Sequence, residues 1–104
     1  MIDKQKAIDN IIENFNWGKV HRAMDALGWT WYDSEGTPSM GALFRCAMNL
    51  LHDAYDGAEK EKTDYIVSTG GFHVRALVSK ETKEVIELRL AFELTNWEYD
   101  EPNY

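Results

Sequence analysis

Residues 33–40, which read DSEGTPSM, divide the chain into two parts with different patterns. Two short helical patterns rich in Trp precede them, and a long amphipathic helix followed by alternating, strand-like sequence comes after them. Within this stretch, Thr37-Pro38 is a strong helix start, because Thr accepts hydrogen bonds from the first free N–H groups and Pro tolerates the first helical position. We therefore expect a helix from Pro38 to about Ala58, which weakens or ends near Gly57.

Two shorter helices are predicted ahead of this stretch, because apolar residues recur there at the spacing of one helix face. Asn16 can cap the second of them, and Gly28 stands where a left-handed residue commonly ends a helix. The apolar face of the first helix is formed by Ala7, Ile8, Ile11, Ile12 and Phe15. That of the second is formed by Trp17, Val20, Met24 and Leu27. The third helix carries the widest apolar stripe, made of Met40, Leu43, Phe44, Ala47, Leu50, Leu51 and Ala54.

Three strands are predicted after the long helix. The first spans Asp64–Thr69, Gly70-Gly71 mark a turn, and a polar loop over Lys80–Lys83 separates the second strand from the third. In the second strand, the alternating apolar residues are Phe72, Val74, Ala76 and Val78, with His73 and Arg75 between them. In the third, one face carries Ile86, Leu88, Leu90, Phe92 and Leu94, and the other carries Glu87, Arg89, Ala91 and Glu93.

One apolar and one polar face on each strand indicate an antiparallel sheet that is covered on one side only. The helices must supply that cover. We therefore predict a two-layer α+β fold in which three helices pack on one face of a three-stranded antiparallel meander, in the order ααα-βββ. Leu88, Leu90 and Phe92 should be buried against the long helix, because that helix has the widest apolar stripe.

The composition predicts one folded domain over residues 1–104. With 44% hydrophobic residues, the chain can bury a single core. Its one Cys rules out an intramolecular disulfide and makes the reducing cytoplasm the expected compartment. No apolar run approaches the ~18 residues of a membrane helix, and the first residues do not resemble a signal peptide. Residues 96–104 have no periodicity and carry three acids, so we expect either a frayed end or a docking tail.

The formal net charge of −7 is concentrated after residue 32. Residues 1–32 carry four acids and four bases, residues 33–64 carry seven acids and three bases, and residues 65–104 carry seven acids and four bases. Binding to the phosphates of nucleic acid relies on a basic surface, which this composition does not supply. We therefore expect no direct binding of nucleic acid and instead a protein partner with a basic surface, because opposite charges speed the encounter.

No group of residues in the sequence forms a complete catalytic or metal-binding motif. His52 and Asp56 stand at i, i+4 and could share a metal ion, but no third ligand is evident, and a solvated helix end also explains them. Cys46 borders the apolar stripe, as a small hydrophobic residue would. His73 shares the polar sheet face with Arg75 and is expected to be a free surface imidazole. We therefore predict no enzymatic activity, no cofactor and no bound metal.

Aromatic residues that stand among acids suit a protein-binding patch. Trp97 has this setting in the tail, and the second half of the long helix adds further acids. Both segments are read as solvated, so their side chains are available to a partner. The predicted partner-binding residues are Asp53, Asp56, Glu59, Glu61, Trp97, Glu98, Tyr99, Asp100 and Glu101.

Three short segments resemble those of small uncharacterised proteins encoded by bacteriophages and prophages. They read LGWTW at 27–31, GTPS at 36–39 and STGGF at 68–72. The resemblance covers residues 15–95 and rests on turns, caps and packing Trp residues, so it assigns no catalytic residue. It implies a phage accessory protein made in the bacterial cytoplasm. Many such small acidic proteins bind and inhibit host factors, and anti-CRISPR proteins are among them.

Three hypotheses about function follow from the sequence. The first is a small acidic accessory protein of the phage type that acts by protein–protein binding, as an inhibitor of a host defence factor. The second is a structural subunit of a homo-oligomer, such as a homodimer. The third is a small metal-dependent enzyme that uses His52, Asp56 and acids of the sheet face.

Overall fold

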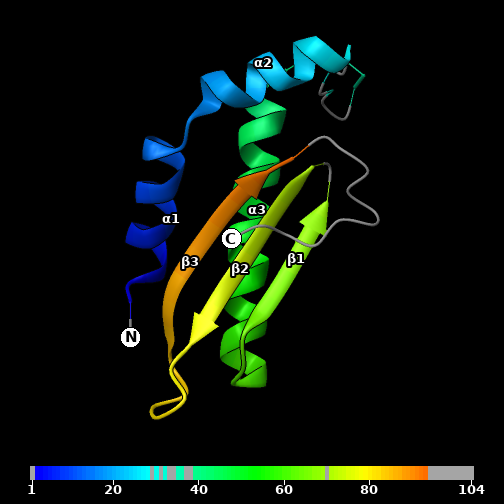
Figure 1. Cartoon of the computed structure of the whole chain (residues 1–104). Coiled ribbons are helices and arrows are strands. Elements are labelled where there is room, and N and C mark those ends of the chain that lie inside the picture. Colours follow the sequence, from blue (N-terminus) through cyan, green and yellow to red (C-terminus); the bar gives the residue numbers. More distant parts are fainter. Residues whose placement is uncertain are drawn as a thin grey trace.

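One long helix, α3 (Met40–Glu61), lies along one face of a three-stranded antiparallel sheet in the computed structural model (Figure 1). The structure describes residues 2–28, 30, 32, 35–36, 39–69 and 71–93. Its other elements are α1 (Lys4–Asn14), α2 (Trp17–Leu27), β1 (Tyr65–Thr69), β2 (Phe72–Val78) and β3 (Val85–Phe92). The sheet order is β1-β2-β3, so the predicted α+β class with three helices followed by a three-stranded meander is confirmed.

The three helices have different positions relative to the sheet (Figure 1). Helix α3 contacts all three strands and covers the inner face. Helix α1 lies beside β3 and also contacts α3. Helix α2 turns away from the direction of α1 and crosses the end of the sheet where β3 finishes.

Polar side chains cap both short helices at their N-terminal ends. Asp3 caps α1, and its carboxylate accepts a hydrogen bond from the N–H of Lys6 at 2.9 Å. Asn16 caps α2 in the same way through the N–H of Lys19 at 3.1 Å. Gly28 ends α2 in the left-handed conformation, with φ of 65°. The predictions for Asn16 and Gly28 are therefore confirmed.

The predicted bounds of α3 were wrong at both ends. The helix begins at Met40 instead of Pro38, because Ser39 is the residue that caps it, with its Oγ 3.2 Å from the amide nitrogen of Ala42. It also continues past Gly57 to Glu61 and ends at Lys62, which adopts a left-handed conformation with φ of 61°.

Gly57 lies inside α3 because the first residue of β1 packs directly against it. A Cβ atom built at Gly57 would lie 2.5 Å from the ring of Tyr65, which is closer than carbon atoms can approach. Gly57 therefore permits the contact between helix and strand, and it does not end the helix.

The core lies between α3 and the inner face of the sheet and extends to α1 and α2. Phe72, Val74 and Ala76 of β2 are completely buried at its centre. Of the three residues predicted to be buried in the third strand, Leu88 is buried, whereas Leu90 and Phe92 are partly buried and pack against the core. The whole core comprises Ile8, Val20, Met24, Leu43, Ala47, Leu50, Leu51, Ala54, Tyr55, Ala58, Phe72, Val74, Ala76, Val85 and Leu88.

An irregularity in the pairing of β2 with β3 changes which side of β3 faces inward. Leu77 pairs with Glu87, but Val78 pairs with Val85, so Ile86 is an extra residue in the ladder. Such a bulge lets the next residue take the inner position. Val85 is accordingly buried and Ile86 is 50% exposed, and the prediction that Ile86 faces the core was wrong.

The contact between Gly57 and Tyr65 is tested by replacing Gly57 with Ala. In an ordinary helix interior, this change stabilises a protein by up to about 1 kcal/mol. Here the added methyl group collides with the Tyr65 ring, so we expect Gly57→Ala to lower the unfolding free energy by about 1–3 kcal/mol. Denaturant unfolding measures the change.

Gly41→Ala is the matched control, because Gly41 lies in the same helix and its added Cβ would have no neighbour nearer than 3.4 Å. This variant should be as stable as the native protein or gain up to about 1 kcal/mol. Equal stability of the two variants would contradict the close approach of Tyr65 to Gly57.

Candidate functional site

A cluster of aromatic rings holds the corner between α1 and α2 against the rest of the fold. Trp17 is at its centre, and its Nε1–H donates a hydrogen bond to the carbonyl oxygen of Ile12 at 2.7 Å. The centroid of its ring lies 5.1 Å from that of Phe15, 4.7 Å from that of Phe44 on α3 and 6.1 Å from that of Phe72 on β2. All three contacts have the edge-to-face geometry that aromatic rings prefer. Trp17 thereby links four separate segments of the chain.

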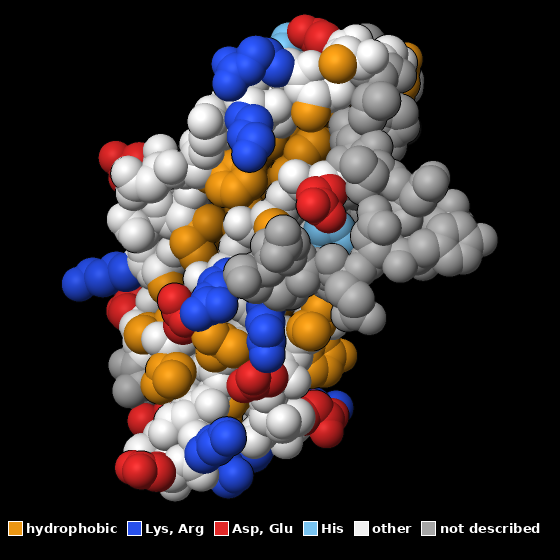
Figure 2. Space-filling view, in the orientation of Figure 1, with side chains coloured by type: hydrophobic (Ala, Val, Ile, Leu, Met, Phe, Trp, Pro, Cys, Tyr) orange, Lys and Arg blue, Asp and Glu red, His pale blue; other side chains and the backbone are white. Residues whose placement is uncertain are grey.

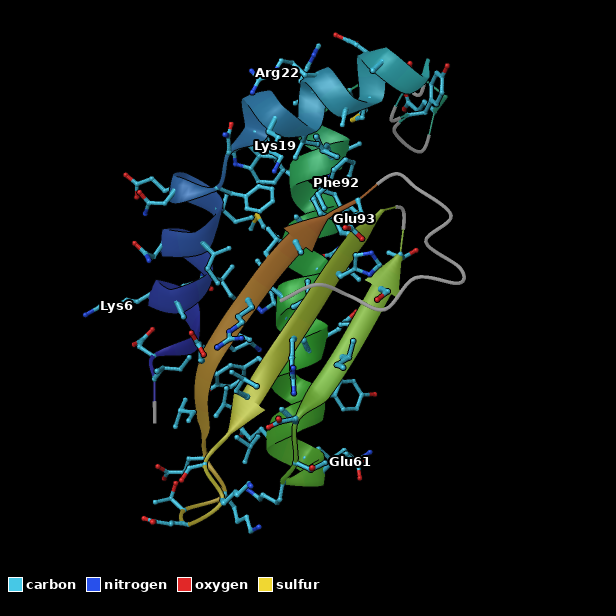
Figure 3. All side chains as sticks on the ribbon, in the orientation of Figure 1. Lys6, Lys19, Arg22, Glu61, Phe92 and Glu93 are labelled. Atoms are coloured by element: carbon cyan, nitrogen blue, oxygen red, sulfur yellow. The ribbon has the colours of Figure 1, made fainter. Side chains whose placement is uncertain are left out.

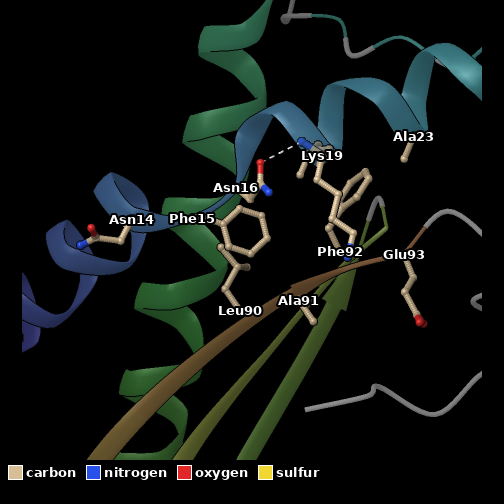
Figure 4. A pocket seen from close by; sticks show the side chains of 10 residues that line it. Asn14, Phe15, Asn16, Lys19, Ala23, Leu90, Ala91, Phe92 and Glu93 are labelled. Atoms are coloured by element: carbon tan, nitrogen blue, oxygen red, sulfur yellow. Dashed lines mark hydrogen bonds between the residues drawn. The ribbon is translucent and has the colours of Figure 1, made fainter.

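Because this corner is held, α2 crosses above the end of β3 and leaves a groove beneath it. Val20 and Met24 fix the inner side of α2, with exposed fractions of 2% and 6%. The groove has a volume of about 540 Å³. It is lined by Asn14, Phe15, Asn16, Lys19, Val20, Ala23, Leu90, Ala91, Phe92 and Glu93 (Figure 4).

The groove has a mixed lining, in which six residues are apolar and four are polar or charged. Phe15 lies above Leu90 of β3, and Ala23 stands farther along α2, above Glu93 (Figure 4). Lys19 and Arg22 are exposed on α2, one helical turn apart, above Phe92 and Glu93 at the end of β3 (Figure 3). Figure 2 shows the same region from outside, with basic side chains over α2 beside hydrophobic surface. Within the described part of the chain, Lys19 and Arg22 form no ion pair.

The predicted acidic residues of α3 lie at the other end of the molecule. Asp53, Asp56, Glu59 and Glu61 are all exposed, as expected, and Glu61 marks the end of α3 far from the groove (Figure 3). Asp56 pairs with Lys4 of α1, with 2.6 Å between its carboxylate and Nζ. A shallow hollow there is lined by Asp56, Glu59, Lys60 and Lys62. The acids are thus interspersed with lysines, and the pair with Lys4 weakens their combined field further.

The other predicted binding residues lie outside the residues that the structure describes. These are Trp97, Glu98, Tyr99, Asp100 and Glu101. Their role therefore stays a prediction from the sequence.

Tyr55 and Lys4 connect α1 to α3 next to Asp56. The hydroxyl group of Tyr55 donates a hydrogen bond to the carbonyl oxygen of Ile2 at 3.3 Å, and Nζ of Lys4 lies 5.6 Å from the centre of the Tyr55 ring. Burial raises the pKa of the Tyr55 phenol, and the negative charge of Glu59 raises this pKa further, while Lys4 opposes the shift. In this structure, Asp56 therefore belongs to a contact between two helices.

The structure shows the surroundings of the residues considered in the sequence as possible nucleophiles, catalytic groups or metal ligands. Cys46 is partly buried, and burial raises the pKa of its thiol, so the reactive thiolate is disfavoured. Arg89 pairs with Glu87 on the outer sheet face at 3.1 Å. Among the described residues, no group of three or more His, Cys, Asp and Glu side chains is placed to hold a metal ion.

The burial of His73 differs from what the sequence predicted. It was expected to be a free surface imidazole, but it is only 1% exposed, and its Nδ1 lies 2.9 Å from Oγ of Ser68. The cross-strand register explains this pair, because Ser68 lies directly opposite His73 in the antiparallel ladder. His73 is therefore buried although it lies on the polar face of its strand.

The groove was not predicted from the sequence, although one feature of the sequence indicated that α2 changes direction. The interruption at Phe15-Asn16 showed that α2 must leave the direction of α1. It did not show where α2 goes, because that depends on Trp17 meeting rings that are distant in the sequence.

No protein-family model, curated protein or solved structure matches this chain. Within the described ranges, none of the helices combines the length and the apolar character needed to cross a membrane.

The environment of Tyr55 gives a prediction about stability at high pH. Its pKa is raised in the folded protein, so the unfolded chain loses the phenolic proton first as the pH rises above 10. The stability that Tyr55 contributes is complete below that pH and is lost as the pH rises through the folded pKa. We expect the unfolding free energy of the native protein to fall more steeply above pH 10 than that of Tyr55→Phe.

The comparison uses denaturant unfolding of both proteins at several pH values from neutral to alkaline. Near pH 7, Tyr55→Phe should be less stable by about 0.5–1.5 kcal/mol, because it lacks the hydrogen bond to Ile2. The two proteins differ only in the Tyr55 hydroxyl group, so the difference between the curves reports the effect of that group. Parallel curves would contradict the raised pKa.

Proposed function

We propose that this protein binds another protein and that a segment of the partner lies in the groove between α2 and the end of β3. The single observation that supports the proposal is the groove itself, a hollow of about 540 Å³ in which six of the ten lining residues are apolar, with exposed cations on its rim. Hollows of this size with a few polar groups at the edge are typical of binding sites. The apolar lining would receive side chains, and the rim would select for charge.

The sequence-based prediction of protein binding is kept in this proposal, but the main contact surface is a different one. The acidic residues of α3 are interspersed with lysines, and Asp56 is already paired with Lys4. They would act at most on the rate of encounter with a basic partner, because exposed charges steer association more than they hold a complex together. The role as a phage-type inhibitor of a host defence factor is proposed on the resemblance of sequence segments alone.

The proposal is tested by filling the groove. Ala23 lines it from α2, so Ala23→Trp places a large ring in the hollow. Short random peptides are selected on the native protein, and the enriched ones are measured by titration calorimetry. We expect their affinity for Ala23→Trp to be at least about tenfold lower, because the ring occupies the space of a peptide side chain.

Ala26→Trp is the matched control, because Ala26 is on the same helix and exposed and does not line the groove. It should bind the enriched peptides as the native protein does. Thermal unfolding of both variants shows that the fold is retained. Enrichment of no peptide, or equal affinity for the native protein and Ala23→Trp, would overturn the proposal.

A further inference from the structure

We infer that the groove takes its ligand as an extended segment that pairs with the free edge of β3 and so becomes a fourth strand of the sheet. The segment would place apolar side chains in the hollow and an acidic side chain at Lys19. This inference rests on the proposed binding function and adds to it the conformation and the chemistry of the partner. Peptides that add a strand to a sheet edge are a recurring mode of recognition.

The backbone of β3 presents free hydrogen-bonding groups at the groove. The N–H of Glu93 donates a hydrogen bond to the carbonyl oxygen of Gly71 at 2.8 Å, so the backbone N–H and C=O groups of Glu93 point toward β2. In an antiparallel ladder, the backbone groups of successive residues point alternately to the neighbouring strand on one side and away from it. Ala91 therefore also faces β2, and both Leu90 and Phe92 direct their N–H and C=O groups away from it.

Independent observations on β2 support this alternation. The N–H of Val78 donates a hydrogen bond to the carboxylate of Asp64 at 2.8 Å, so the backbone groups of even-numbered residues of β2 point toward β1. The backbone groups of odd-numbered residues then point toward β3, as the carbonyl group of Gly71 does. The cross-strand partners His73 and Ala91 accordingly form one of the hydrogen-bonded pairs of β2 and β3.

The free groups of Leu90 and Phe92 point to the side where α1 and α2 lie. The sheet ends at β3, and Figure 1 shows α1 beside that edge and α2 across its end. Near the start of β3, the edge is used, because the N–H of Ile2 donates to the carbonyl oxygen of Val85 at 3.3 Å. In the ranges that the structure describes, no backbone group is bonded to Leu90 or Phe92 on this side. The groove is the space next to these two residues.

The two walls of the groove define what side chains the added strand would carry. Side chains of neighbouring strands alternate in step, so every second residue of the segment would lie on the side of Leu90 and Phe92. That side is closed by Phe15, Val20 and Ala23 and favours apolar side chains. The residues between them would lie on the side of Ala91, toward solvent.

The basic side chains on the rim of the groove favour a peptide that carries an acidic residue. Lys19 and Arg22 are exposed and unpaired within the described residues, and Glu93 is the acid at the end of the groove. An acidic side chain of the segment would pair with Lys19 on α2. The inferred partner is therefore an extended peptide with apolar residues at alternate positions and one Asp or Glu near its contact with α2.

Amide hydrogen exchange tests the added strand directly. In the free, full-length protein, the amides of Leu90 and Phe92 should exchange fast, and that of Ala91 should be protected, because only Ala91 is bonded to β2. With saturating amounts of the peptide enriched on the native protein, Leu90 and Phe92 should become protected at least about tenfold. The amide of Ala91 is the internal control and should change little.

The peptide is also methylated at one backbone nitrogen at a time. Methylation at alternate positions should abolish binding, because those N–H groups donate to β3, and methylation between them should be tolerated. Lys19→Gln should weaken binding of the peptide severalfold, and Lys6→Gln, on the outer side of α1, should not. Replacing the peptide's acid with its amide should remove the difference between the native protein and Lys19→Gln.

The outcomes separate this inference from the proposed function. Binding that is weakened by Ala23→Trp but leaves Leu90 and Phe92 unprotected would overturn the added strand while leaving groove binding intact. Slow exchange of Leu90 and Phe92 in the free protein would also overturn it, because the edge would already be covered. If Lys19→Gln binds the peptide as tightly as the native protein does, the inference that the peptide carries an acidic residue at Lys19 would be overturned. If no peptide is enriched, the proposed function fails, and the inference fails with it.

Discussion

The position of Trp17 is the constraint on which the rest of the structure depends. Its ring meets Phe44 of α3 and Phe72 of β2, and its indole N–H is bonded to the last turn of α1. Phe72 in turn packs against Phe92, with 4.8 Å between the ring centroids, so the cluster reaches the end of β3. These contacts set the direction of α2, and the direction of α2 creates the groove. Trp17 is partly buried and packs against the core, so its contribution comes from these ring contacts and the hydrogen bond together.

The location of the groove also resolves a general problem of small sheets. A free edge strand is a template for unwanted pairing, and proteins usually shorten, charge or cover such edges. Here the first part of the β3 edge is engaged by Ile2, and the last part lies beneath α2.

The sequence was sufficient for the order and type of the elements, because these depend on local patterns. Apolar spacing located the helices, Asn16 and Gly28 bounded α2, and alternation located the strands. The predicted end of α3 was wrong, because a Gly near the end of a helical pattern commonly stops a helix, whereas Gly57 lies within α3 and leaves room for the ring of Tyr65. The prediction for Ile86 was also wrong, because a bulge shifts the alternation by one residue without leaving a trace in composition.

The candidate site was not predictable in the same way. The acids of α3 were correctly expected to be exposed, but the ion pair between Asp56 and Lys4 depends on how α1 packs. The hydrogen bond of His73 depends on its cross-strand neighbour Ser68. The groove depends on rings that are far apart in the chain. All three features arise from tertiary contacts, which local spacing does not encode.

The central claim is that the aromatic cluster holds α2 above the end of β3. Nuclear Overhauser effects from the ring protons of Trp17 in the native protein test it most directly. The account predicts contacts from this ring to both Phe44 and Phe72, together with slow exchange of the indole N–H, because that group is bonded to Ile12. An indole N–H that exchanges at the rate of free tryptophan, with no contact to Phe72, would contradict the account, because α2 would then not be anchored and the groove would not exist.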